Sequence, residues 1–321
     1  MRVAYLECFS GISGNMFLGA LLDAGVGEDV LRRTIKSLNV GADLNVSRVN
    51  RRGISATNVE VLVDGSAAQH HDPSTHHGYV HGHESMRPPM GGEHQHHSHK
   101  SHESNHHPSH RPLSKIREMI RLADISDAAR VVATRAFDIL GNTEAKIHNM
   151  PVESIHFHEV GAVDSIVDII CGAVGCDALG VEAFLCSPLN VGGGTVQCAH
   201  GEYPVPAPAT LELLKGAPIY SSGIEAELVT PTGAAMLRAL ECRFSSFPQM
   251  TVETIGYGAG YKNLNGQPNV LRISVGDLKQ RRGPGAPDRD PGASRPGAGT
   301  DLADQHGPGR HQVHRRTTAV V

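Results

Sequence analysis

Apolar residues recur along most of the chain with a helical or a strand period, and these periods predict its elements. Val3 to Leu6 is a short apolar run, followed by a glycine loop and by apolar residues on one helical face up to Gly25. This order predicts a strand, a loop and a helix. A second helix is expected from Val30 to Leu38. Residues 44–49 and 58–63 partly alternate, which predicts two strands of one sheet.

The second half of the chain is predicted to be mainly helical, with short strands between glycine turns and a final strand at 269–275. Helices are expected at 113–120, 128–147, 162–179, 206–214 and 232–240. Strands interspersed with helices indicate an α/β (or α+β) fold, in which a mixed sheet has flanking helices.

Two segments show neither period. The first carries 14 of the 21 histidines among Gly, Pro and Ser, and the second is rich in Arg, Gly and Pro. Neither can bury a core, so we expect a long disordered His-rich loop and a disordered C-terminal tail. The predicted organisation is an N-terminal α/β part at 1–65, the loop at 66–111, the rest of the α/β domain at 112–278 and the tail at 279–321.

Charge and cysteine content narrow the class of protein. A net charge of −4 gives no reason to expect nucleic acid or an anionic membrane as partner. The six cysteines form no CxxC pair and lie mostly in apolar runs, which is typical of buried thiols in a reducing compartment. No signal peptide or membrane span is recognisable, so we expect a cytoplasmic protein.

The predicted loop is a candidate metal-binding segment. Neutral imidazole suits Ni²⁺, Zn²⁺, Cu²⁺ and Co²⁺, and a flexible chain can wrap several imidazoles around one ion without fixing a geometry. Such a segment favours binding and delivery of a metal over catalysis, whereas the alternative is a spacer that is merely biased towards histidine. The candidate ligands are His94, His96, His97, His99, His102, His106, His107 and His110.

A second polar cluster precedes and enters the predicted helix at 162–179. His156 and His158 alternate on an extended segment, so their side chains point the same way. Glu159 follows at a turn, and Asp164 and Asp168 are four residues apart on one helix face. These groups could bind a metal or transfer protons. The alternative is a capped helix with polar residues at its mouth.

Glycine loops supply candidate cofactor-binding residues. A loop between a strand and a helix can hold phosphate through backbone N–H groups at the helix start. The loops match neither the Walker A motif nor GxGxxG, so simple tight turns are the alternative interpretation. The residues concerned are Ser10, Gly11, Ser13, Gly14, Gly193 and Gly194.

Taken together, these stretches resemble the LarC family, the nickel insertion proteins for pyridinium-3,5-bisthiocarboxylic acid mononucleotide. The resemblance rests on six blocks in family order across roughly residues 1–278. They lie at 9–23, 156–165, 187–195, 200–210, 228–235 and 256–272. A histidine-rich insertion at this place is also typical of the family.

The resemblance implies a CTP-dependent nickel insertase of the lyase class, a cyclometallase that binds Ni²⁺ to the nucleotide through two sulfurs and a ring carbon. The product would serve lactate racemase. Family members usually have Asp where this chain has Asn15. They also usually continue into a C-terminal domain that holds CTP with a divalent cation, which nothing from Lys279 onward resembles. The resemblance therefore implies the unshifted product of a frameshifted gene, a nickel-binding N-terminal part that needs a CTP-binding C-terminal part.

Two other hypotheses remain open at this stage. The chain could be a nickel storage or delivery protein without catalysis. It could also be a metal-independent α/β enzyme that uses His156, His158 and Glu159 as acid and base.

Overall fold

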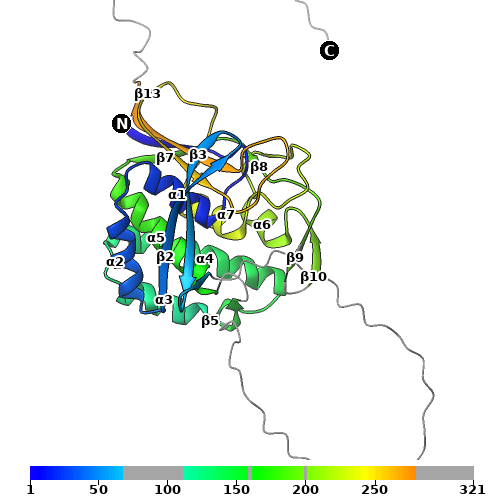
Figure 1. The fold of residues 1–321 in the computed structure, drawn as a ribbon. Coiled ribbons are helices and arrows are strands. Elements are labelled where there is room, and N and C mark those ends of the chain that lie inside the picture. The colour runs from blue at the N-terminus through cyan, green and yellow to red at the C-terminus, as the bar shows by residue number, and fades with distance from the viewer. Residues whose placement is uncertain (68–110, 158–160, 199–200, 280–321) are drawn as a thin grey trace, which may run out of the picture. The chain divides into compact units, whose positions relative to one another are not determined.

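One mixed β-sheet organises the protein (Figure 1). The computed structural model describes residues 1–67, 111–157, 161–198 and 201–279. The strands follow the order β12-β7-β1-β14-β13-β3-β2, and β4 pairs with β3. Their bounds are β1 Arg2–Glu7, β2 Ala42–Arg51, β3 Ile54–Val63, β4 Ser66–Ala67, β7 Ala183–Cys186, β12 Arg243–Phe244, β13 Met250–Ala259 and β14 Val270–Leu278.

The pairing in this sheet is both parallel and antiparallel. β1 is parallel to β7 and antiparallel to β14, whereas β2 and β3 form an antiparallel pair. Smaller two-stranded pairs lie outside the sheet. They comprise β5 Arg111–Pro112 with β6 His156–Phe157, β8 Leu189–Asn190 with β11 Ile219–Tyr220, and β9 Thr195–Cys198 with β10 Gly201–Pro204. The predicted fold class, a mixed sheet with flanking helices, is confirmed.

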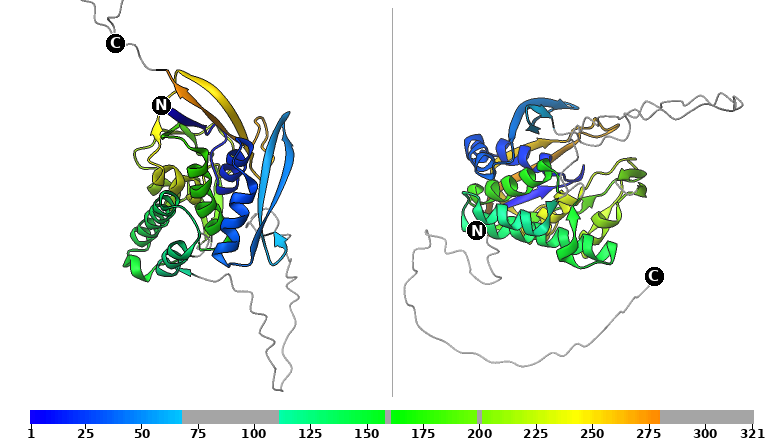
Figure 2. Two further views of the ribbon diagram at one scale, coloured as in Figure 1. Left: turned by 90° about the vertical axis from the view of Figure 1, so that its left-hand side faces the viewer. Right: turned by 90° about the horizontal axis from the view of Figure 1, so that it is seen from below.

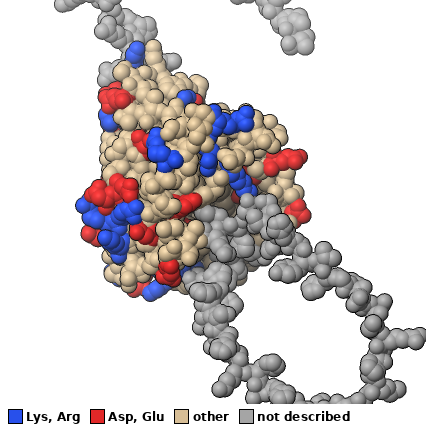
Figure 3. Space-filling view, in the orientation of Figure 1, with Lys and Arg blue, Asp and Glu red and all other residues tan. Residues whose placement is uncertain are grey.

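The predicted helices are all present, with ends that differ from the expected ones by a few residues. Their bounds are α1 Gly14–Asp23, α2 Glu28–Leu38, α3 Leu113–Leu122, α4 Asp127–His148, α5 Val163–Leu179, α6 Pro208–Leu213 and α7 Pro231–Ala239. Helix α2 shows why such a segment is stable at the surface. It buries Leu31, Ile35 and Leu38, and an Arg32–Glu28 ion pair of 2.6 Å lies on its exposed side. Acidic and basic side chains intermingle over this side of the molecule (Figure 3).

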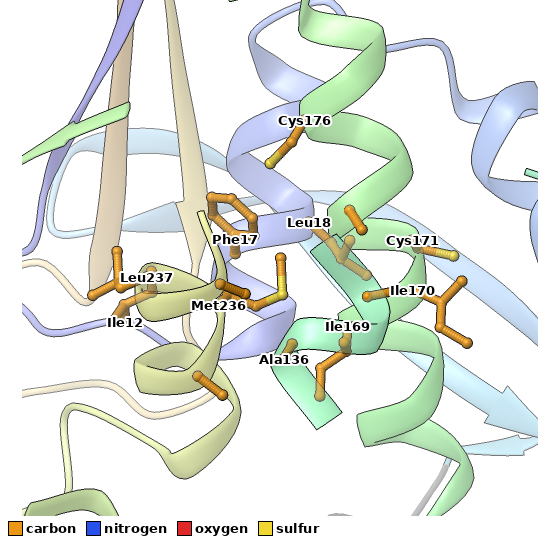
Figure 4. Packing of buried hydrophobic residues seen from close by; sticks show 14 of the residues in the cluster. Ile12, Phe17, Leu18, Ala136, Ile169, Ile170, Cys171, Cys176, Met236 and Leu237 are labelled. Carbon is orange, nitrogen blue, oxygen red and sulfur yellow. The ribbon is translucent and has the colours of Figure 1, made fainter. Parts of the chain in front are cut away.

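The main core lies between the sheet and the helices, which gather on one face of the sheet (Figure 2). Phe17 and Leu18 of α1, Ile169 and Ile170 of α5, and Met236 of α7 are buried together there (Figure 4). On the opposite face of the sheet, residues of β1 and β7 form a smaller cluster of Val3, Tyr5 and Leu185.

The cysteines are free thiols, as expected; four are buried and two are half-buried. Burial raises the pKa of the Cys171 and Cys176 thiols, so both stay protonated and unreactive. No helix in the described part of the chain is long and apolar enough to cross a membrane. The predicted His-rich loop, apart from its first and last residues, and the predicted tail from Gln280 onward lie outside the described residues.

Candidate functional site

Three loops that are far apart in the sequence meet beyond the carboxyl end of β1. The amide of Ile12 donates to the Leu228 carbonyl at 2.9 Å, and the Thr230 amide donates back to the Ile12 carbonyl at 3.1 Å. The amide of Asn190 donates to the Cys8 carbonyl at 3.2 Å. The glycine loop at 8–14, the segment at 190–194 and the segment at 226–230 therefore form one assembly, the loop cluster. Ligands of α/β proteins bind beyond the carboxyl ends of parallel strands such as β1 and β7.

Within the loop cluster, several residues predicted to bind a cofactor have structural roles. The Ser10 hydroxyl is buried and donates to the Pro268 carbonyl at 2.7 Å. Gly11 has a φ of +75°, and a Cβ there would lie 1.9 Å from the Leu228 carbonyl oxygen, so only glycine fits. The Gly193 amide donates to the Ala226 carbonyl at 3.3 Å, and Gly194 has a φ of +79°.

The first turn of α1 is the part of the loop cluster that is best suited to an anion. Ser13 occupies the N-cap position, but its hydroxyl forms no capping bond and donates instead to Asn15 Oδ1 at 2.7 Å. The backbone N–H groups at the start of a helix have no partner within the helix and attract negative charge. The structure thus leaves Ser13 and Gly14 as candidates for nucleotide binding.

The side chain at position 15 fixes α1 to β13. Asn15 is buried, and its Nδ2 donates to the Ala259 carbonyl at 3.1 Å. A carboxylate cannot donate this bond, so the contact requires the amide of Asn15.

A buried carboxyl group lies directly beside this turn. Asp168 of α5 is 7% exposed, and a Cβ added to Gly14 would lie 2.2 Å from its Oδ2. Among the described residues, its Oδ1 has no hydrogen-bond partner. Burial, and then the nearby Asp164 carboxylate, raise the pKa of Asp168 well above its usual range. Asp164 and Asp168 lie on one face of α5, as their spacing predicted.

Tyr261 lies close enough to Asp168 and Asp164 for their charges to act on it. The periodicity of the sequence did not identify it as a site residue. It follows β13, and its hydroxyl donates to the Val59 carbonyl of β3 at 3.0 Å. Burial raises the pKa of Tyr261, and the nearby Asp168, Glu60 and Asp164 carboxylates raise it further. The only sequence clue was its place directly after the glycine-rich block at 256–260.

The predicted histidine cluster is described only in part. His156 is exposed in β6, while Phe157 is buried, with its ring centroid 6.3 Å from that of Phe137. Asp164 lies in the first turn of α5. His158 and Glu159 lie outside the described residues, so the convergence of the whole cluster stays a prediction.

His156 also lies where the His-rich segment rejoins the fold. Strand β5 begins directly after that segment, and its Pro112 pairs with His156 of β6. The described residues contain no group of three or more His, Cys, Asp or Glu side chains placed to hold a metal ion. The predicted metal-binding histidines, from His94 to His110, lie outside them.

Comparison with known proteins identifies the family. The profile described as nickel insertion protein matches residues 4–300. A pyridinium-3,5-bisthiocarboxylic acid mononucleotide nickel insertion protein of Geobacillus kaustophilus is 41% identical over 86% of this chain and 60% of its own length. Proteins of the same name from Desulfitobacterium hafniense and a Thermotoga species are 42% and 41% identical, each over 87% of this chain.

These relatives are longer than the chain, which spans about 60% of the length of those it matches. No solved structure matches. The extent of the profile match and the identity to the relatives show that the chain belongs to the nickel insertion protein family.

Proposed function

We propose that this chain inserts Ni²⁺ into pyridinium-3,5-bisthiocarboxylic acid mononucleotide, as the nickel-binding part of an insertase. The relatives' names state this substrate for those proteins. The observation that carries the proposal is the loop cluster. It joins three blocks of family resemblance, at 9–23, 187–195 and 228–235, into one assembly beside a buried carboxyl group. Such an arrangement supports an active site. A nickel storage protein would need only the histidines to bind the metal.

Nickel capture is assigned to the His-rich segment and nickel transfer to the ordered residues next to it. Soft sulfur ligands and a square-planar preference make Ni²⁺ a suitable metal for a bisthiocarboxylate. The pairing of β5 with β6 brings the end of the segment to His156, which supports a path from the captured ion to the ordered fold. His158, Glu159 and Asp164 are proposed to act with His156 in the transfer.

The nucleotide is assigned to the loop cluster. Its phosphate would bind at the N-terminus of α1, where Ser13 and Gly14 lie and where the helix dipole attracts an anion. Ser10, Gly11, Gly193 and Gly194 would shape the loops around it, because their hydrogen bonds and positive φ angles hold the segments together.

CTP, together with a divalent cation, is proposed to act from a further C-terminal part, and the nickel-loaded nucleotide is proposed to pass to lactate racemase. Both proposals come from the family resemblance. They fit a cytoplasmic enzyme of cofactor biosynthesis. The alternative function is nickel storage or delivery without catalysis, which the histidine content alone would also support.

The test is insertion itself. The purified chain is incubated with the nucleotide and Ni²⁺, with and without CTP, Mg²⁺ and the C-terminal part of a relative, and the product is identified by mass spectrometry and by racemase activation. We expect the nickel-loaded nucleotide only when CTP and the C-terminal part are present. Stoichiometric nickel binding without product in every mixture would favour the storage alternative.

A variant separates capture from transfer. We expect His156→Ala to bind as much nickel as the wild-type chain but to lower the insertion rate by at least about 10-fold, in the lower range of proton-transfer and ligand effects at active sites. His148→Ala, at the end of α4 where His148 pairs with Glu144, is the matched control. Equal insertion rates for the wild-type chain and His156→Ala would limit His156 to a structural role.

A further inference from the structure

Asp168 is a buried carboxyl group with one oxygen that no described residue satisfies. It is 7% exposed in the second turn of α5, and no hydrogen bond from another described residue reaches its Oδ1. A buried, unsatisfied polar group costs free energy, so each such group in a native protein needs an explanation. The residue therefore points to a functional role for this carboxyl group.

The surroundings of Asp168 favour a cationic part of the ligand on the side of Gly14 that faces α5, while the backbone N–H groups of the first turn of α1 remain for the phosphate. Its Oδ2 would lie 2.2 Å from a Cβ at position 14, so the absence of a side chain on Gly14 is what makes room for the carboxyl group. The titratable groups that act on Asp168 or respond to it are Asp164 and Cys171 of α5 and Tyr261 after β13. Among these described residues no cation faces the carboxyl group. A positively charged ligand would supply the missing charge.

The proposed substrate has the matching chemistry. Its pyridinium ring is a cation, and its thiocarboxylates stand at ring positions 3 and 5 on either side of the carbon at position 4. An Ni²⁺ ion held by both sulfurs faces that carbon. A bond between the nickel and this carbon can form only if its hydrogen leaves, and no oxidant is needed if it leaves as a proton.

We propose that Asp168 is the base that accepts the proton from ring position 4 as the carbon–nickel bond forms. This inference rests on the proposed function. The C–H bond breaks, its electron pair becomes the carbon–nickel bond, the proton moves to a carboxylate oxygen of Asp168, and nickel remains Ni²⁺. Burial and Asp164 raise the pKa of Asp168, whereas the positive charge of the pyridinium ring and of Ni²⁺ would lower this pKa and favour the ionised carboxylate.

The neighbouring residues have separate roles in this step. Gly14 is a positioning residue, because any larger side chain would displace the Asp168 carboxyl group. Asp164, four residues earlier on the same face of α5 and half-buried, is placed to receive the proton and pass it towards solvent. Tyr261, whose pKa is raised in part by the Asp168 carboxylate, is held in place by its hydrogen bond to the Val59 carbonyl.

The experiment measures insertion by Asp168 variants under conditions that support insertion by the wild-type chain. We expect Asp168→Asn to lower the rate by about 10²–10⁴-fold, as loss of a general base does, with little change in the Kd for nickel or nucleotide. Asp168→Glu should retain part of the rate with a shifted acidic limb of the pH–rate profile. Asp168→Ala leaves a small cavity, so added formate should restore activity to it and not to Asp168→Asn.

Controls and isotopes make the outcome specific. Asp177→Asn, on the same helix and bonded to Ser126, should insert nickel at the wild-type rate. Deuterium at ring position 4 should slow the wild-type reaction. If Asp168→Asn inserts nickel as fast as the wild-type chain, or if formate restores nothing and the pH profile of Asp168→Glu is unchanged, the role as base is wrong while the proposed function stands. Failure of the wild-type chain in every condition would overturn both.

Discussion

At the scale of single residues, the candidate site combines side chains whose hydrogen bonds stabilise the fold with a side chain whose burial costs stability. Ser10 and Asn15 each have buried hydrogen bonds that join α1 and its loop to the segment around 259–268. Asp168 is the exception, since burial opposes its charge and no described residue compensates for it. Residues of this second kind tend to mark functional sites, because the stability they cost is retained only where activity needs it.

The first prediction concerns the stability cost of Asp168. Its pKa in the folded protein lies above the unfolded value near 3.9. The folded protein therefore keeps a proton that the unfolded chain has lost, and the free energy of unfolding falls as pH rises from about 4 through the folded pKa. The amide side chain of the Asp168→Asn variant cannot ionise, so this variant should be more stable than the wild-type chain at pH 7. The difference should be about 1.4 kcal/mol for each unit by which folding raises the pKa of Asp168.

Urea denaturation at several pH values checks this expectation. The difference in unfolding free energy between Asp168→Asn and the wild-type chain should grow from pH 4 towards neutral pH. The surface variant Asp29→Asn, which removes an exposed ion pair with Arg33, should show a small difference with little dependence on pH. A lower stability of Asp168→Asn at pH 7 would show that the carboxylate is stabilising.

The second prediction concerns Asn15, the buried residue that joins α1 to β13. Asn15→Asp would place a carboxylate oxygen against the Ala259 carbonyl in a buried position and remove the bond from Nδ2. We expect the free energy of unfolding to fall by about 1–3 kcal/mol at neutral pH, the usual cost of an unsatisfied buried polar group. Calorimetry would measure it, with Asn142→Asp on the exposed side of α4 as the control. An unchanged Tm would show that the local backbone adapts to the carboxylate.

At the scale of elements, the crossing of α1 over β13 controls the geometry of the site. Gly256 and Gly258 face the helix, and a Cβ on Gly258 would lie 1.7 Å from the Met16 carbonyl oxygen. On the helix, Gly19 faces the Thr57 carbonyl of β3 in the same way. The glycines thus let the helix backbone lie directly on the sheet, which places the first turn of α1 beside α5.

The same glycines explain what could be predicted from the sequence and what could not. Helices such as α2 and α4 were predictable because their apolar residues repeat with the helical period. Strand β13 was not predicted as a strand, because glycine is disfavoured in strands and interrupts their alternation of side chains. The close contact with α1 nevertheless requires glycine at these positions. Likewise, Asp164 and Asp168 were expected on one face, but the burial of Asp168 depends on α1, which no local pattern shows.

The third prediction follows from this crossing. Gly258→Ala should push α1 away from the sheet and lower the free energy of unfolding by about 1–3 kcal/mol or more, as overpacking of a core does. Gly193→Ala is the matched control, because the nearest atoms lie 3.6 Å from its added Cβ and its φ is not in the left-handed region. Thermal unfolding of both variants measures the effect. Equal Tm values would mean that α1 has room to move on the sheet.

At the scale of the whole molecule, the fold and the His-rich segment are joined at two short strands. Strand β4 pairs with β3 before the segment, and β5 pairs with β6 after it. The core contains residues from both sides of the segment, such as Leu31 and Phe137, so we expect folding not to require the histidines between them. This separation would let one part of the chain collect nickel while another holds the nucleotide.

The last prediction tests that separation. Replacing residues 68–110 with a flexible Gly/Ser linker keeps Ser66, Ala67, Arg111 and Pro112, and therefore both strand pairs. We expect the Tm to change by less than about 2 °C, since a longer or shorter surface loop alters the closure entropy only slightly. Bound nickel, measured by equilibrium dialysis and metal analysis, should fall to a small fraction of the wild-type value.

A matched variant keeps the segment's length and replaces its histidines with Ser, which separates the role of imidazole from that of the chain itself. In the wild-type protein, bound nickel should decline as pH falls below about 6.5, because protonated imidazole cannot bind a metal. The variant with Ser in place of these histidines should show no such decline, because it binds little nickel at any pH. If it bound as much nickel as the wild-type chain, the metal would belong to the ordered residues, and His156 with the α5 carboxylates would become the first place to look for its ligands.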